Sequence, residues 1–180
     1  PDHVNAGQAL YLEAKSALGL DRQDAAVRLF QKLQSEYPSH PRAQEAQLSL
    51  GQYFLDQGDV ERVRQQLQAV VNRSSDADQS ARALYLLGTA ERDAGNLSQA
   101  LASFETVSRD FPQSDVAPAA LYAEGSTHIE MDRYEEAAQS FETLGARFPN
   151  SPFAQNLGTA LGEVYYQLGR YDEAIQELSG

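Results

Sequence analysis

Apolar residues recur along this 180-residue chain at steps of three and four, which is the spacing of one face of an α-helix. Residues 78–94 carry one such stripe, and residues 97–110 carry a second. Gly95 and Asn96 separate the two stripes, and Pro112 follows the second; these residue types are typical of helix ends. The pattern predicts a unit of two helices joined by a short turn.

This unit recurs every 37 residues. One column holds glycine, at Gly51, Gly88, Gly125 and Gly162, and another holds a large apolar residue, at Phe30, Leu67, Phe104, Phe141 and Leu178. The period predicts helix pairs at 4–19/23–37, 41–57/60–72, 78–94/97–110, 115–131/134–147 and 152–168/171–179. The second unit departs from the pattern, because Ser74 and Ser75 stand where other units have an aromatic residue followed by proline.

The glycine column needs a physical reason, because a glycine inside a helix costs about 1 kcal/mol relative to alanine. We expect each glycine, beside the small residues Ala46, Ala83 and Ala120, to let the paired helix approach closely. The large apolar residue is then expected to fill the space between one hairpin and the next. A single hairpin cannot bury its apolar face, whereas stacked hairpins form a continuous core.

Within one unit the order of key residues resembles the tetratricopeptide repeat (TPR) pattern: Leu84, Leu87, Gly88, Gly95, Ala100, Phe104 and Pro112. The resemblance covers nearly five units. It implies an all-α fold, a right-handed superhelical solenoid of about five TPR-like helix-turn-helix repeats of 37 residues. We expect a single domain over residues 1–180, with repeats at 4–40, 41–77, 78–114, 115–151 and a truncated 152–180.

A narrower resemblance comes from the phrases YPSHPRAQEAQ, FPQSDVAPAA and FPNSPFAQN. They are similar to the TPR modules of bacterial cell-envelope proteins, which include Tol-Pal-associated periplasmic proteins and outer-membrane assembly lipoproteins. This resemblance implies a periplasmic scaffold; a cytoplasmic location is the alternative. The chain starts at Pro1 without a signal-like segment and stops inside a predicted helix, so we expect it to be a fragment of a longer protein.

Charge and composition narrow the function classes. The chain has 14 basic and 26 acidic residues, 14 − 26 = −12, which disfavours nucleic acid as a partner. It has no cysteine, so disulfides, thiolate metal sites and a cysteine nucleophile are excluded. His3, His40 and His128 have no metal-ligand spacing, and the paired acids at the starts of second helices complement the helix dipole. We therefore predict no enzymatic activity, no cofactor and no metal. No apolar run is long enough to insert into a membrane.

The TPR resemblance implies that the first helix of each unit lines a concave groove. Carried onto this chain, that position gives nine candidate partner-binding residues: Tyr11, Leu48, Arg82, Tyr85, Thr89, Arg92, Tyr122, Ser126 and Tyr166. Tyrosine and arginine are enriched among residues that dominate binding energy, and a groove can take an extended peptide or a helix. The sequence thus predicts a non-catalytic scaffold that binds a protein or peptide.

Three alternatives stay open. Tyr85 and Tyr122 could pack in a seam between neighbouring helices without binding anything. The chain could be a structural spacer or oligomerisation module, or the regulatory domain of a multidomain enzyme.

Overall fold

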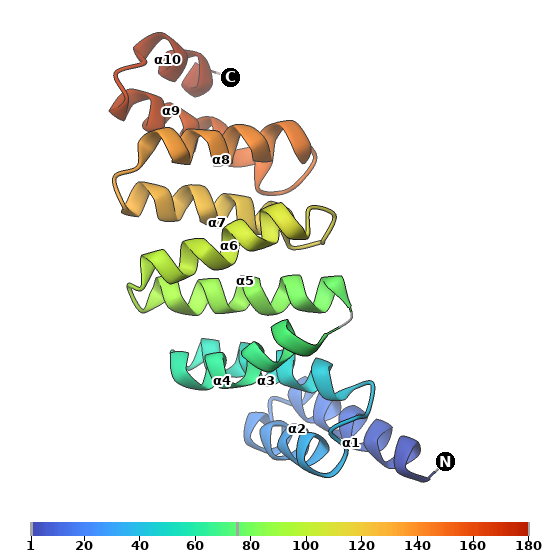
Figure 1. Ribbon diagram of the computed structural model, residues 1–180. Coiled ribbons are helices and arrows are strands. Elements are labelled where there is room, and N and C mark those ends of the chain that lie inside the picture. The colour runs from blue at the N-terminus through green and yellow to red at the C-terminus, as the bar shows by residue number, and fades with distance from the viewer. Residues whose placement is uncertain (1, 75, 180) are drawn as a thin grey trace. The chain divides into compact units, whose positions relative to one another are not determined.

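The computed structural model describes residues 2–74 and 76–179, apart from the side chains of residues 2–4 and 73. Within them the secondary structure is helical, with no strand (Figure 1). The elements are α1 (Asp2–Gly19), α2 (Gln23–Glu36), α3 (Ala43–Asp56), α4 (Val60–Arg73), α5 (Ala77–Asp93), α6 (Leu97–Asp110), α7 (Ala117–Glu130), α8 (Tyr134–Arg147), η1 (Ala154–Asn156), α9 (Leu157–Gln167) and α10 (Tyr171–Ser179). The predicted all-α repeat fold is confirmed. Ser75, in the exit loop of the second repeat, lies outside the described residues.

The helices form two compact units, residues 1–86 and 87–180, with the division inside α5. In the N-terminal unit α1 packs on α2, α2 on α3 and α3 on α4. In the C-terminal unit α6 packs on α7, α7 on α8, α8 on α9 and α9 on α10. Each unit is therefore a stack of helical hairpins in which sequence neighbours pack together. That residues 1–180 form one domain stays a prediction.

The turn inside each hairpin has the same backbone conformation at intervals of 37 residues. Its central residue has a positive φ: 56° at Asp21, 69° at Gly58, 77° at Gly95, 57° at Asp132 and 73° at Gly169. The next residue donates its backbone N–H to a carbonyl five residues earlier, as from Asn96 to Glu91 at 2.8 Å. This is the Schellman pattern, which satisfies the last carbonyls of a helix and stops it. The predicted breaks between the paired helices are confirmed.

The glycine column allows the close approach that the sequence predicts. A Cβ added at Gly88 would lie 2.6 Å from Cε1 of Phe104, and one at Gly125 would lie 2.5 Å from Cε1 of Phe141. Leu67 and Leu178 lie in the same way over Gly51 and Gly162. The large residue therefore rests on the glycine of its own hairpin, sixteen positions before it. It also fills the space between hairpins, since Phe141 of α8 shares a core cluster with Leu157 and Leu161 of α9.

Three first helices start later than the sequence predicts, while α1 and α5 start one or two residues earlier. α3 begins at Ala43 and not at 41, α7 at Ala117 and not at 115, and α9 at Leu157 and not at 152. Each is preceded by a tight turn in which an N–H bonds a carbonyl three residues back, as from Ala43 to His40 at 2.8 Å and from Ala154 to Ser151 at 3.0 Å. Such bonds belong to turns and 3₁₀ geometry, so the α-helix begins later.

Candidate partner-binding surface

All nine candidate residues lie on the first helix of a hairpin. Tyr11, Leu48, Arg82 and Tyr85 belong to the N-terminal unit. The C-terminal unit holds Thr89, Arg92, Tyr122, Ser126 and Tyr166, which we call the first-helix face. Arg82 and Tyr166 are exposed, and the other seven side chains are half-buried.

Tyr122 of α7 packs between two phenylalanines. Its ring centroid lies 5.6 Å from that of Phe141 on α8 and 5.8 Å from that of Phe153, which precedes α9. Tilted aromatic pairs at these separations add stabilisation beyond the area they bury. One part of the Tyr122 ring therefore packs between the hairpins, and the rest of the half-buried ring is exposed to solvent.

Tyr11 of α1 occupies the corresponding position in the N-terminal unit. Its ring lies 6.1 Å from Phe30, and the guanidinium of Arg42 lies 5.2 Å from its centroid. Burial raises the pKa of Tyr11 to about 12, and the hydrogen bond that its hydroxyl makes to Glu45 acts in the same direction. Arg42 also forms an ion pair with Glu45, so the cluster of Tyr11, Arg42 and Glu45 links α1 to the start of α3.

The two tyrosines share a contact that sequence reasoning missed. Each touches the residue 31 positions later, just before the next first helix: Arg42 for Tyr11 and Phe153 for Tyr122. Arg42 and Phe153 stand in one column of the 37-residue period, so the period itself was the available signal. Phe153 is 36% exposed, and its side chain extends the apolar surface around Tyr122.

Arg92 is already paired inside the C-terminal unit. Its Nε donates to Oε1 of Glu130, at the end of α7, over 2.8 Å. Both side chains are partly solvent-exposed, so this pair adds little stability. A carboxylate of a partner could reach Arg92 only by sharing the guanidinium with Glu130 or by displacing it. Glu130 is a further residue of this surface that sequence reasoning missed, because the two residues lie 38 positions apart.

The last two members of the first-helix face differ in availability. The Ser126 hydroxyl donates to the backbone carbonyl of Tyr122 at 2.9 Å and is thus occupied within α7. Tyr166 is 61% exposed, and its ring lies 5.7 Å from that of Tyr171 on α10. The exposed fraction makes Tyr166 the aromatic of this face that a partner could cover most completely.

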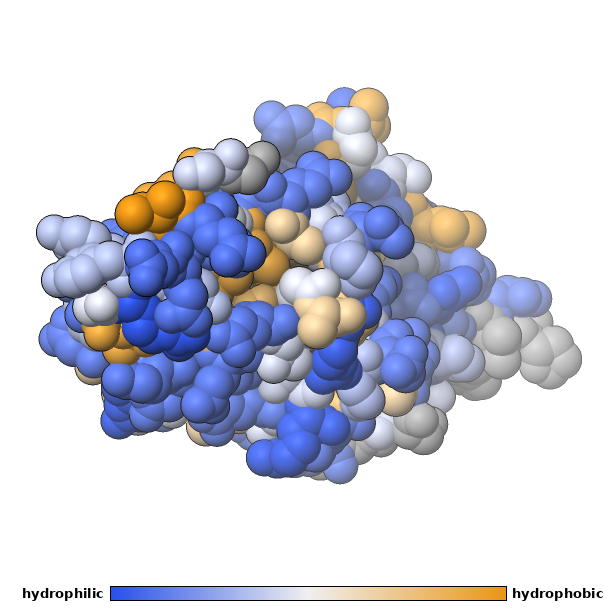
Figure 2. All heavy atoms as spheres, turned by 90° about the horizontal axis from the view of Figure 1, so that it is seen from above, coloured by the Kyte–Doolittle hydropathy of each residue, from blue (hydrophilic) through white to orange (hydrophobic). Residues whose placement is uncertain are grey.

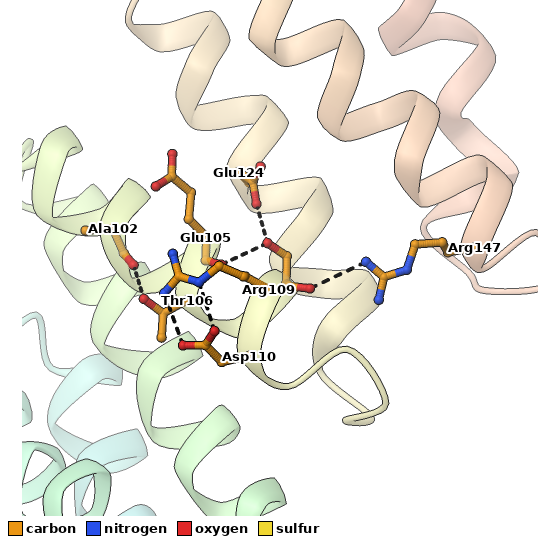
Figure 3. Close-up of polar contacts among 8 residues, drawn as sticks. Ala102, Glu105, Thr106, Arg109, Asp110, Glu124 and Arg147 are labelled. Atoms are coloured by element: carbon orange, nitrogen blue, oxygen red, sulfur yellow. Dashed lines mark hydrogen bonds and ion pairs between the residues drawn. The ribbon is translucent and has the colours of Figure 1, made fainter.

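A polar hollow of about 250 Å³ lies between α6, α7 and α8 of the same unit. Glu124 of α7 accepts hydrogen bonds from Ser108 of α6 at 2.9 Å and from Ser140 of α8 at 2.8 Å. At the edge of the hollow Arg147 donates to the carbonyl of Ser108 (Figure 3) and to that of Pro112. Because both carboxylate oxygens are bonded within the unit, this cluster ties three helices together. The sequence indicates this cluster through Glu124, because the equivalent positions of the second, third and fifth repeats hold leucine.

Among the described residues no group of three or more potential ligands could hold a metal ion. His128 is 5% exposed and buried within α7, while the side chain of His3 lies outside the described residues. Over the same part of the chain, none of the helices combines the length and the apolar character that crossing a bilayer requires.

Comparison with known families identifies the repeat. A family described as a tetratricopeptide repeat-like domain matches residues 2–113, and the tetratricopeptide repeat family matches residues 85–152 and 122–179. The chain belongs to the tetratricopeptide repeat family. The TPR fold supports a role in protein–protein interaction. No curated protein sequence matches the chain.

Solved structures resemble this TPR protein over nearly its whole length. The MamA protein has 21% sequence identity and a TM-score of 0.78, with 97% of this chain and 88% of that chain covered. PilF of Pseudomonas aeruginosa has 17% identity and a TM-score of 0.75, covering 98% and 75%. A tetratricopeptide repeat protein from Parabacteroides merdae has 17% identity and a TM-score of 0.79, covering 97% and 65%. At these identities the likeness concerns the fold alone.

Proposed function

We propose that this TPR protein is a non-catalytic scaffold that binds a protein or peptide across the first helices of its hairpins. The observation that carries the proposal is the set of partly exposed aromatic rings on the first-helix face and beside it: Tyr122, Phe153, Tyr166 and Tyr171. Aromatic rings that neighbouring side chains already hold in place lose little conformational entropy when a partner binds them.

The binding energy should come mainly from these rings. Arg92 is paired with Glu130, so its charge is partly neutralised before a partner arrives. The net charge of −12 repels acidic partners at long range. The partner segment is therefore apolar or mixed in charge, and its affinity depends modestly on salt.

We further propose that the chain works in a bacterial cell envelope, in the periplasm, as part of a larger protein of the Tol-Pal-associated or outer-membrane lipoprotein type. The support is the aromatic–Pro–x–Ser phrase before a first helix, which occurs at 111–114 and 148–151 in this sequence, while 37–40 shares the aromatic–Pro pair but has His40 in the last position. A protease-accessibility assay on intact cells and on spheroplasts tests the location. Degradation only after the outer membrane is opened is expected, and protection in spheroplasts would contradict it.

The binding face is tested by photo-crosslinking in the native envelope. A photoreactive amino acid at Ser126 should give a discrete adduct with the partner, while the same amino acid at Gln139, exposed on a second helix, should not. The partner from the adduct is then purified, and its affinity is measured for Tyr166→Ala and Tyr122→Ala. At least one variant should lose about 2 kcal/mol or more.

Gln139→Ala is the matched control and should bind like the parent. Circular dichroism must show that each variant keeps its helices, because Tyr122 also packs on Phe141. If folded Tyr166→Ala and Tyr122→Ala both bind as tightly as the parent, the first-helix face is not the site. A structural spacer then becomes the better account of the chain.

A further inference from the structure

The polar hollow between α6, α7 and α8 contains a carboxylate where neighbouring hairpins have leucine. Hydrophilic residues cover most of the face drawn in Figure 2, which views the molecule from above relative to Figure 1, so polarity alone does not mark a site. Glu124 is distinguished by its position, because the equivalent residues of α3 and α9 are the buried Leu50 and Leu161. Its half-buried carboxylate accepts from Ser108 and Ser140, and these two hydrogen bonds hold it in a fixed position.

The N-terminal unit shows another way of filling the same three positions. Two periods before the two serines stand Gln34 of α2 and Gln66 of α4, and Nε2 of Gln34 donates to Oε1 of Gln66 over 3.1 Å. Leu50, at the position of Glu124, is fully buried there. Two carboxamides therefore meet between the second helices of the N-terminal unit. Serine is too short for this bridge, and the C-terminal unit has a hollow of about 250 Å³ at this place.

A cation stands at the edge of the hollow beside the carboxylate. Glu124 and Arg147 both bond to Ser108, one through its hydroxyl and the other through its carbonyl (Figure 3). Arg147 bonds only to backbone carbonyls and forms no ion pair with any described residue. The second cation of the lining, Arg109, is already paired with Asp110 at 2.8 Å. Glu124 keeps a lone pair on each oxygen, and Arg147 keeps N–H groups, for a further partner.

These two groups together select a neutral occupant that both donates and accepts. An ammonium group would suit Glu124 but would oppose the charge of Arg147, and a carboxylate would suit Arg147 but would oppose Glu124. A primary carboxamide has two N–H donors and one carbonyl acceptor, so it satisfies both. It is also the group that the N-terminal unit places between its own second helices.

The size and lining of the hollow favour a small molecule over a protein segment. About 250 Å³ is the volume of about eight water molecules, enough for one small polar molecule. Of the described residues that line the hollow, only Leu121 is apolar, and it is 3% exposed. A protein segment would find no apolar surface here of the kind that forms the centre of an interface.

We propose that this hollow binds a small free molecule that carries a primary carboxamide, of the size of glutamine. The amide N–H groups donate to Glu124, and the amide carbonyl accepts from Arg147. The site requires neither the first-helix face nor the partner proposed above.

The probe is L-glutamine, titrated into the whole 180-residue chain and followed by NMR of the backbone amides. Saturable shifts are expected at Ser108, Ser140 and Thr143, with a Kd of about 1–10 mM. L-Glutamate has a carboxylate in place of the carboxamide, and L-lysine has an ammonium group. Each should bind at least about tenfold more weakly than L-glutamine. The absence of saturable shifts, or equal binding of the three amino acids, would overturn the proposal.

Two variants of the chain remove the same charge from different places. Glu124→Leu gives α7 the residue that α3 and α9 have, so it should fold, and it should weaken glutamine binding about tenfold or more. Glu105→Leu, at an exposed position of α6, should leave binding unchanged. Equal effects of the two variants would mean that Glu124 does not bind the amide, and the proposal would be wrong.

A third variant fills the hollow from within. Ser108→Gln combined with Ser140→Gln places the chain's own carboxamides beside Glu124, as in the N-terminal unit, and should abolish glutamine binding. Circular dichroism must show that the helices survive. A folded double variant that binds glutamine like the parent would place the binding outside the hollow.

Crosslinking distinguishes a free molecule from a side chain of a protein. Gln139 lines the hollow, so a photoreactive amino acid there should give no protein adduct if the occupant is a free molecule. A discrete protein adduct from Gln139 that Glu124→Leu abolishes would assign the hollow to a protein side chain and reject the proposal. Tyr122→Ala should leave glutamine binding unchanged, so failure here and failure of the first-helix face are distinguishable.

Discussion

A methyl group added at Gly125 tests whether the glycine column exists for close packing. Gly125 lies in α7, and its missing Cβ would be 2.5 Å from Cε1 of Phe141 and 2.8 Å from Cδ1 and Cζ. Non-bonded carbon atoms do not approach so closely, and a rigid aromatic ring has no terminal bond whose rotation could relieve the clash. Gly125→Ala must therefore move the ring or separate α7 from α8.

The expected magnitude is a balance of two terms. Overpacking a close-packed core costs about 1–3 kcal/mol, whereas replacing a helical glycine by alanine gains up to about 1 kcal/mol. Gly125→Ala should thus lower the free energy of unfolding by up to about 2 kcal/mol. Gly145, in α8 of the same unit, supplies the matched control, because its added Cβ would meet only Cδ1 of Leu157, at an ordinary 3.4 Å. Gly145→Ala should be neutral or stabilising.

The assay is urea denaturation followed by circular dichroism, with the slope of the transition compared between variants, since repeat proteins need not unfold in one step. The two alanine variants should differ by about 1–3 kcal/mol. Adding Phe141→Leu to Gly125→Ala should recover part of the loss, because the chain itself pairs Gly51 with Leu67. If Gly125→Ala were as stable as Gly145→Ala, the packing argument would be wrong.

Two further perturbations test the hairpin turn and the seam between α8 and α9. Gly95→Ala should lower the free energy of unfolding in urea by about 1 kcal/mol, and Gly95→Asn should lower it less. The cause is the backbone, because φ is 77° at Gly95 and nothing lies within 4 Å of the added Cβ. Equal stability of the parent and both variants would argue against this cause. Burial, followed by a 2.8 Å hydrogen bond to Glu142, raises the pKa of Tyr165 to about 12 from the usual 10. Its protonated hydroxyl therefore stabilises the fold fully below pH 10, and this stabilisation is lost as the pH rises towards 12. Tyrosinate absorbance, taken as the difference from Tyr165→Phe, should give this pKa and a lower one in Glu142→Gln; an ordinary pKa in the parent would refute the assignment.

The repeat and its helix pairs could be predicted from the sequence because they depend on local properties that recur. Gly95 supplies a positive φ, Gly88 supplies a close approach, and the apolar steps of three and four define the buried faces. Each of these acts within one hairpin, so the same residue types appear every 37 positions. The helix starts were less predictable, because Ala43 and Ala117 follow tight turns whose bonds span only three residues.

The contacts of the candidate surface were harder to predict, because they join side chains across hairpins. The pair Arg92–Glu130 depends on two long side chains from different repeats choosing compatible rotamers. The tilted ring contact between Phe153 and Tyr122 depends on the path of a turn that precedes α9. Columns of residue types indicated that Tyr122 lies on a first helix, but they did not indicate how much of its ring is already used by neighbours.

The hairpin turn also couples two columns that appear unrelated in the sequence. The Schellman bond from Asn96 to the carbonyl of Glu91 brings together residues five positions apart, and the Asn96 amide then donates to the Glu91 carboxylate at 2.9 Å. The same bond from Arg170 to Tyr165 places the guanidinium 4.3 Å from the centre of the tyrosine ring. At these two turns the residue after the turn contacts the side chain five positions before it, whereas Nδ1 of the buried His128, five positions before Arg133, has no hydrogen-bond partner among the described residues. The turn therefore fixes which backbone positions meet, and the residue types at those two positions decide whether their side chains also pair.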